Sequence, residues 1–155
     1  MWVNVRGAAT ISMTGDGALS FIDTNVLVYA FDKGASPKKR VAQRLMKELM
    51  DEDRLRVSTQ VLQELFVTLT RKVSQPCSSG EALAVLEDLT AWPLLVVDYA
   101  AIRAAVELAG QARLSFWDAL IVVAAVRSGA TVLYTEDLND GQEILGVHVT
   151  NPFRA

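Results

Sequence analysis

Short apolar segments alternate with longer segments of helical period along most of the chain. The segments that predict strands end at Ile22 or cover residues 55–57, 94–97, 131–134 and 147–149. The helical patterns cover residues 37–52, the stretch that follows a cap at Ser58 or Thr59, and residues 79–90, 99–112 and 115–129. Strands that alternate with helices are typical of an α/β domain with a mainly parallel sheet.

Two of these patterns make detailed predictions about burial. In the helix over 37–52, apolar residues lie along one side at Val41, Leu45 and Leu49, which predicts a buried stripe there. The continuous apolar run from Leu94 to Val97 predicts a strand that is buried on both faces.

The length and composition indicate one folded domain. The chain has 155 residues, of which 51% are hydrophobic and 21% charged. Residues 1–19 show no clear period, so we interpret them as an N-terminal tail or an over-long start, with Met13 as an alternative first residue, and residues 20–155 as a single domain. The longest wholly apolar run covers residues 119–126. A spanning helix needs about 20 such residues, so we expect no membrane partner.

The cysteine and charge content narrow the class of protein further. Cys77 is the only cysteine, which excludes an internal disulfide and fits a reducing cytoplasm. The only histidine is His148, in a strand-like stretch, which disfavours a Cys–His catalytic pair. The formal net charge of −3, taken alone, argues against a nonspecific nucleic-acid binder.

Four acidic residues occupy the ends of predicted elements. Asp23 directly follows the first strand, and Glu64 lies in the helix after the second. Asp118 lies in the first turn of the helix over 115–129, and Asp137 follows the strand over 131–134. Binding sites in open parallel sheets lie outside the carboxyl ends of the strands. We therefore expect these four side chains to converge.

Each acid also has a purely structural interpretation. Asp23 fits a helix N-cap, Glu64 fits a solvated flank, and Asp137 fits a polar turn. Asp118 forms with Ser115 the S-x-x-D pattern of a capping box. Taken together, however, converging carboxylates repel one another unless a cation compensates their charge. An all-oxygen set favours Mg²⁺, with Mn²⁺ as an alternative.

Four segments, in this order, resemble the signatures of PIN-domain ribonucleases, and most closely those of the VapC-type toxins of bacterial toxin–antitoxin pairs. They are FIDTNVLVYAFD (21–32), VSTQVLQELFVTLTRK (57–72), LSFWDALIVVAA (114–125) and LYTEDLNDGQ (133–142). The resemblance covers about residues 20–152. It implies a three-layer α/β/α sandwich, a homodimer, and a small antitoxin protein that inhibits by covering or entering the acidic pocket.

The resemblance also implies a set of site residues and an activity. Carried over by position, the acidic metal-binding quartet of the family falls on Asp23, Glu64, Asp118 and Asp137. Supporting polar positions fall on Thr24, Asn25, Ser115 and Thr135. Asp140 is an alternative for the fourth acid. The implied activity is that of a Mg²⁺- or Mn²⁺-dependent endoribonuclease, in which an activated water attacks an RNA phosphodiester in line.

Residues outside the quartet offer candidate contacts to RNA. The candidates for a face that follows the RNA backbone are Lys38, Lys39, Arg40, Arg44 and Lys47, and a solvated helix exterior explains them equally well. For Trp117 we predict packing in the core, with stacking on a base as the alternative.

Two other functions fit parts of the sequence. A haloacid-dehalogenase-like phosphatase also has an acid after its first strand, but it requires a D-x-D start where this chain has Asp23, Thr24 and Asn25. A catalytically degenerate PIN fold that only binds RNA or protein is the other alternative, and the presence of all four acids argues against it.

Overall fold

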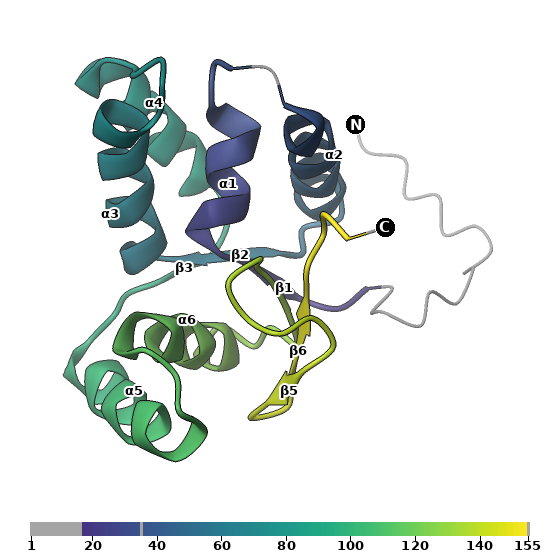
Figure 1. Cartoon of the computed structure of the whole chain (residues 1–155), viewed down its shortest axis with the longest axis vertical. Helices are drawn as coiled ribbons and strands as arrows, with labels where there is room; N and C mark the ends of the chain where they lie inside the picture. The colour runs from purple at the N-terminus through teal and green to yellow at the C-terminus, as the bar shows by residue number, and fades with distance from the viewer. Residues whose placement is uncertain (1–16, 35, 155) are drawn as a thin grey trace.

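A mainly parallel sheet forms the centre of the molecule (Figure 1). The structure is a computed structural model that describes residues 17–34 and 36–154. Its strands are β1 (Ser20–Ile22), β2 (Leu55–Ser58), β3 (Leu94–Leu95), β4 (Val132–Tyr134), β5 (Glu143–Ile144) and β6 (Val147–Thr150), in the order β3-β2-β1-β4-β6-β5. Only β5 runs antiparallel to its neighbour. The prediction of a mainly parallel sheet is confirmed.

Helices cover both faces of this sheet. They are α1 (Thr24–Phe31), α2 (Pro37–Asp51), α3 (Thr59–Val67), α4 (Ser79–Leu89), α5 (Tyr99–Ala112) and α6 (Phe116–Arg127), and a short π-helical segment, η1 (Thr68–Lys72), continues α3. Figure 1 shows α1 to α4 on one side of the sheet and α5 and α6 on the other. The predicted three-layer α/β/α sandwich is therefore confirmed.

The strand order reverses at β1. From β1 the chain moves outward to β2 and β3, and then returns to place β4 on the other side of β1. The last residues of the two central strands, Ile22 and Tyr134, are partners in the register. In open α/β sheets a crevice forms outside the carboxyl ends of the strands at such a reversal. Asp23 follows β1 and Thr135 follows β4, so the fold brings these segments to the crevice.

The central elements are the most deeply buried. Phe21 and Ile22 of β1 are fully buried, and every residue of α6 from Ala119 to Ala125 is buried. Such burial follows from the sequence, because this part of α6 has no polar side that could face water.

The predicted strand over 94–97 is wrong in length and burial. Only Leu94 and Leu95 form β3, both are half-buried, and Val96 is 66% exposed. The reason is the position of β3 at the edge of the sheet, where it pairs with β2 alone. An edge strand has one unpaired side, and a run of apolar residues does not distinguish it from a central strand.

The buried side of α2 is also shifted from the prediction. The residues that face the core are Ala42, Met46 and Leu49, whereas Val41 is 38% exposed. Neighbouring positions on a helix differ by about 100°, and the small Ala42 allows α2 to pack closely on α1.

The predicted tail over 1–19, including Met13, lies outside the described residues up to residue 16. The residues that follow join the sheet: the carbonyl oxygen of Leu19 accepts a hydrogen bond from Thr131 N at 2.9 Å. In the described part of the chain no single helix is long and apolar enough to cross a membrane. By length and composition α5 and α6 would suffice only as a pair, and they are bent by 117° where they meet.

Candidate active site

A groove of about 820 Å³ opens at the crevice between β1 and β4. Its lining includes Asp23, Asn25, Glu64, Lys72, Trp117 and Asp137. These residues come from the turn after β1, from α3 and η1, from α6 and from the turn after β4. The groove therefore joins segments that are far apart in the sequence.

Asp23 is both a helix cap and the most buried acid of the groove. It is the N-cap of α1, and its Oδ1 accepts a hydrogen bond from Thr24 N at 2.7 Å. Its Oδ2 accepts hydrogen bonds from Thr135 Oγ1 at 2.8 Å and from Asn25 Nδ2 at 3.3 Å. The capping interpretation and the placement at the groove are thus both correct for this residue.

Burial changes the acidity of Asp23. Its side chain is cut off from water, with 5% of the residue exposed, and this desolvation raises its pKa from 3.8 to about 7. The hydrogen bonds from Thr135 and Thr24 lower the pKa, and the charges of Asp137 and Glu64 raise it. A nearby cation would favour the ionised form of this carboxyl.

Asn25 connects the first acid with the fourth. Its Nδ2 donates to Asp137 Oδ2 at 2.9 Å and to Thr135 Oγ1 at 3.2 Å, in addition to Asp23. Its Oδ1 accepts a hydrogen bond from Glu136 N at 3.4 Å. Because one amide group spans both turns, Asn25 fixes the position of the two carboxylates relative to each other.

Glu64 lies in α3, and two side chains hold its carboxylate. Thr24 Oγ1 donates to Glu64 Oε2 at 2.8 Å, and Gln60 Nε2 donates to Glu64 Oε1 at 2.9 Å. Thr24 thus joins Glu64 to the turn that carries Asp23. The predicted solvated flank does not describe this residue, which is half-buried and lines the groove.

Gln60 is a site residue that the sequence analysis missed. It is 4% exposed, and its Nε2 donates to the carbonyl oxygen of Trp117 at 3.3 Å as well as to Glu64. Its Oε1 is buried without a hydrogen-bond partner among the described residues. The signal in the sequence was the spacing of Gln60 and Glu64 by four residues, which places both on one side of a helix.

Asp118 lies in the first turn of α6. The N-cap of this helix is Ser115, whose side chain accepts a hydrogen bond from Asp118 N at 3.1 Å. This bond confirms the capping role of Ser115. Burial raises the pKa of Asp118, the hydrogen bond with Ser115 lowers it, and the charges of Asp137 and Glu64 raise it. Asp118 therefore lies in the same electrostatic environment as these two acids.

The two candidates for the fourth acid lie in different places. Asp137 lines the groove, and its N donates to Thr135 Oγ1 at 3.1 Å. Asp140 instead accepts a hydrogen bond from Asn151 N at 2.8 Å and is not part of the groove. The geometry thus favours Asp137 over Asp140.

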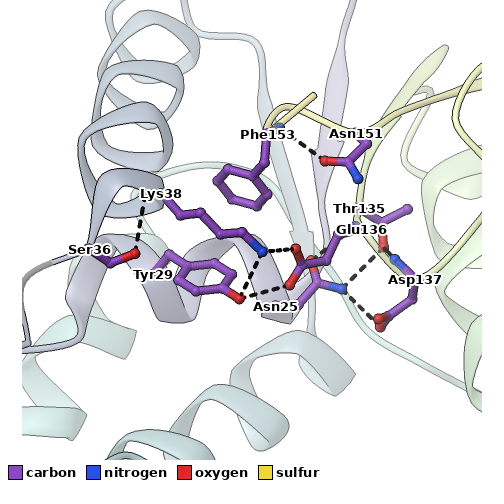
Figure 2. Close-up of polar contacts among 9 residues, drawn as sticks. All are labelled: Asn25, Tyr29, Ser36, Lys38, Thr135, Glu136, Asp137, Asn151 and Phe153. Carbon is purple, nitrogen blue, oxygen red and sulfur yellow. Dashed lines mark hydrogen bonds and ion pairs between the residues drawn. The ribbon is translucent and has the colours of Figure 1, made fainter. Parts of the chain in front are cut away.

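The turn after β4 is tied to α1 and α2 by a cluster of four side chains (Figure 2). Lys38 Nζ lies 2.7 Å from Glu136 Oε2, and Tyr29 donates through its hydroxyl to Glu136 Oε1 at 3.0 Å. The ammonium group also lies 4.8 Å from the ring centre of Tyr29 and 5.1 Å from that of Phe153. This cluster, Tyr29–Lys38–Glu136–Phe153, holds the residue that precedes Asp137.

The comparison of the sequence with protein families agrees with this geometry. The protein-family model of the PIN domain matches residues 20–139. This range includes Asp23, Glu64 and Asp137, which line the groove, and Asp118, which lies beside it. The chain belongs to the PIN domain family. This membership sets aside the dehalogenase-like alternative. A comparison with curated proteins found no match.

Solved structures of toxins have the same PIN fold. A toxin–antitoxin complex from Klebsiella pneumoniae is similar at a TM-score of 0.65 and 18% identity, covering 88% of this chain and 99% of that one. VapC20 of Mycobacterium tuberculosis, a toxin that cleaves the sarcin–ricin loop, has a TM-score of 0.63 and 20% identity over 76% and 91% of the two chains. DNA-bound VapBC of Salmonella typhimurium has a TM-score of 0.61 and 20% identity over 87% and 98%.

The acids of this PIN domain suit a divalent ion that is held loosely. In residues 17–34 and 36–154, no three side chains among Asp, Glu, His and Cys are arranged to hold one ion in common. None of the ion pairs within these residues involves Asp23, Glu64, Asp118 or Asp137, so their charges are uncompensated. Mg²⁺ usually keeps several waters and needs only one or two carboxylates. The donor set therefore fits such an ion.

The predicted basic face does not contribute to the groove. Lys38 pairs with Glu136, Lys39 Nζ donates to the carbonyl oxygen of Asp32 at 2.6 Å, and Lys47 pairs with Asp51. Of the described residues, Lys72 is the only basic one that lines the groove.

The prediction that Trp117 packs in the core is wrong. Trp117 is 62% exposed and lines the groove, whereas its neighbour Phe116 packs against the core. The reason is its direction: Trp117 points about 100° around α6 from Phe116, toward the groove rather than the core. Because the helix is apolar in sequence almost throughout, its sequence does not show that this residue of the first turn is exposed.

Proposed function

We propose that this PIN domain is a Mg²⁺- or Mn²⁺-dependent endoribonuclease that acts as the toxin of a toxin–antitoxin pair. The observation that carries the proposal is the buried carboxyl of Asp23, fixed by Thr135 and Asn25 in a groove that it shares with Glu64 and Asp137. The fold likeness to VapC20, a toxin that cleaves the sarcin–ricin loop, supports RNA as the substrate.

The side chains of the groove have distinct roles in the proposed reaction. The four acids Asp23, Glu64, Asp118 and Asp137 would together hold the ion. Asn25 fixes the positions of Asp23 and Asp137 relative to each other. The bound ion would supply an activated water and offset the charge on the phosphoryl group. Asp118 would accept the proton of the attacking water, since burial and the neighbouring acids raise its pKa and make it a better base.

The bonds that change follow from water as the nucleophile. The water oxygen attacks the phosphorus in line, and the bond from phosphorus to the 3′-oxygen breaks. The 3′-oxygen leaves with a proton, so the products carry a 5′-phosphate and a 3′-hydroxyl. The 2′-hydroxyl of the RNA takes no part in this route.

We further propose that an antitoxin inhibits the enzyme by inserting a basic side chain into the groove. Arginine is the favoured residue, because its guanidinium can pair with two carboxylates at once. The Klebsiella pneumoniae structure is a toxin–antitoxin complex, which supports such a partner for a chain of this fold. The homodimer is proposed on the family resemblance. Val67 on α3 and Leu83 on α4 are exposed apolar residues that a protein contact would cover.

The decisive experiment measures cleavage of total cellular RNA by the purified protein with Mg²⁺, with Mn²⁺ and with EDTA. We expect Asp23→Asn and Asp118→Asn to lose activity by at least about 100-fold, the lower end of the general-base contribution, while their far-UV circular dichroism stays native. Asp140→Asn is the matched control, because this acid lies outside the groove, and it should retain full activity. Expression without a partner should be toxic for the wild type and for Asp140→Asn, and harmless for Asp23→Asn and Asp118→Asn.

Full activity of Asp23→Asn or Asp118→Asn, or undiminished cleavage in EDTA, would show the proposed site to be wrong. Absence of cleavage by the wild-type protein under all three conditions would instead favour the catalytically degenerate alternative.

A further inference from the structure

We propose that an unpaired RNA base stacks on the indole of Trp117, which makes Trp117 a substrate-binding residue of the groove. This inference rests on the proposed ribonuclease function and names a residue that binds its substrate. It starts from the contrast within α6, in which Trp117 is 62% exposed although every residue from Ala119 to Ala125 is buried. A large aromatic side chain exposed in a groove is a surface that a ligand with a flat apolar face can cover.

The Trp117 side chain is held in place before any ligand binds. Its ring packs against Phe116 edge to face, with ring centres 5.0 Å apart and planes at 72°. Its carbonyl oxygen accepts a hydrogen bond from the buried Gln60. A platform whose position is fixed in advance loses little entropy when a base binds to it.

Gln60 also couples the platform to the acids. The same Nε2 that donates to the Trp117 carbonyl donates to Glu64 Oε1, and the residue after Trp117 is Asp118. Gln60 is itself 4% exposed, so its side chain is fixed between Trp117 and Glu64. A base on Trp117 would thus lie next to the carboxylates that act on the RNA backbone.

One cation in the groove can contact a phosphate. Lys72, at the end of η1, is the one basic residue among those described that lines the groove. Single-stranded nucleic acid is bound by aromatic side chains that stack on bases together with cations that contact phosphates. In an RNA duplex the bases are stacked on each other, so Trp117 can contact only an unpaired base.

The test measures binding separately from cleavage. Asp23→Asn protein with Mg²⁺ is titrated with a short labelled single-stranded RNA, and the dissociation constant is compared after a second substitution at Trp117. We expect Trp117→Ala to weaken binding about tenfold or more, as loss of one stacked base does, and Trp117→Phe to keep most of the affinity. Tyr99→Ala is the matched control, because Tyr99 is a 77% exposed aromatic residue on α5 outside the groove, and it should have no effect.

A second comparison identifies the base as the contact. A series of RNAs is compared in which one abasic nucleotide stands at a different position in each. Protein that retains Trp117 should bind one of these RNAs more weakly than the intact strand, whereas Trp117→Ala should bind that RNA as well as the intact strand. A duplex of the same sequence should bind both proteins equally. Thermal melts of every variant show whether the fold is retained.

Single-strand affinity that is unchanged in folded Trp117→Ala would overturn the inference. So would a Trp117→Ala variant that binds RNA normally but has lost its antitoxin, because Trp117 would then be a protein contact. These outcomes leave the ribonuclease proposal standing if the wild type cleaves RNA. If the wild type does not cleave but its RNA binding depends on Trp117, the proposed catalysis fails and the stacking site remains.

Discussion

Asp23 shows how one residue combines a structural and a chemical role. As an N-cap it satisfies the backbone of α1, and as a buried acid it has a pKa near neutrality. Burial dominates here, because the hydrogen bonds from Thr135 and Thr24 do not offset the loss of water. The residue that stabilises the start of the helix thereby carries a cost for the fold when it ionises.

This cost makes the stability of the metal-free protein depend on pH. The folded-state pKa of Asp23 is about 7 and its ordinary value is 3.8, so the folded state binds more protons between these limits. Stability therefore falls as pH rises from about 4 to about 7. One pKa unit corresponds to about 1.4 kcal/mol, so the ionised carboxyl costs up to about 4 kcal/mol above pH 7.

We expect Asp23→Asn to remove this dependence. In urea unfolding with EDTA, the free energy of unfolding of the variant should rise relative to that of the wild type from pH 5 to pH 8. The reason is that asparagine caps a helix as well as aspartate does and carries no charge. A free-energy difference between the two proteins that is the same at both pH values would contradict the assignment of the shift to Asp23.

At this scale the sequence indicates the acids but not the contacts that hold them. The four acids stand out because each follows a strand or lies in the early part of a helix. Asn25 is among the expected supporting positions, but the sequence does not show its partners Thr135 and Asp137, which are more than a hundred positions away in the chain. Contacts of this kind depend on the strand order, which local patterns do not contain.

At the scale of elements, the site depends on how firmly its turns are held. The turn after β4 carries Thr135 and Asp137, and the Tyr29–Lys38–Glu136–Phe153 cluster ties it to α1, α2 and the C-terminal segment (Figure 2). Pairing with Glu136, above all through a hydrogen bond, raises the pKa of Lys38. The ion pair is partly exposed, so its contribution to global stability is below about 1 kcal/mol. Its effect on the position of the turn is the larger consequence.

We therefore expect Lys38→Met to lower RNA cleavage more than it lowers stability. Without its cation, Glu136 adds an uncompensated charge beside Asp137 and keeps only the hydrogen bond from Tyr29, so the turn can shift and displace the fourth acid. Lys33→Met is the matched control, because the Lys33–Glu81 pair is similarly exposed but touches no part of the groove. Cleavage rates and urea unfolding would be measured for both. Equal cleavage rates in the two variants would show that the cluster does not position the turn.

Element boundaries were predicted well for helices and less well for strands. Helices such as α2 and α5 have a cap and enough turns to define a period, so they begin and end within a residue of the prediction. The strands are short, and β5 has two residues in a polar stretch, which leaves no pattern to detect. It forms because Leu145 and Gly146 have positive φ values, 50° and 81°, that turn the chain tightly back into β6.

At the scale of the molecule, the strand order creates the site. Asp23, Glu64, Asp118 and Asp137 come from four separate segments, and the reversal between β1 and β4 brings them to one edge of the sheet. Alternation of strands and helices predicts the fold class but not this order. The family resemblance implied a three-layer sandwich with these acids in one site, and the match of the PIN domain to residues 20–139 confirms that resemblance.

A bound ion should stabilise the whole fold, because the acids approach one another only when the chain is folded. The gain follows mass action and reaches about 1.4 kcal/mol when the free ion is tenfold above its dissociation constant. We expect Mg²⁺ to raise the melting temperature of the wild type and of Asp140→Asn equally, and that of Asp118→Asn less. NaCl at matched ionic strength controls for screening.

In EDTA at neutral pH, Asp118→Asn should melt no lower than the wild type, since burial, Asp137 and Glu64 disfavour its charge and Ser115 still caps α6. If Asp118→Asn instead melts far lower in EDTA and Mg²⁺ helps all three proteins equally, Asp118 serves only the helix terminus and the ion does not bind there.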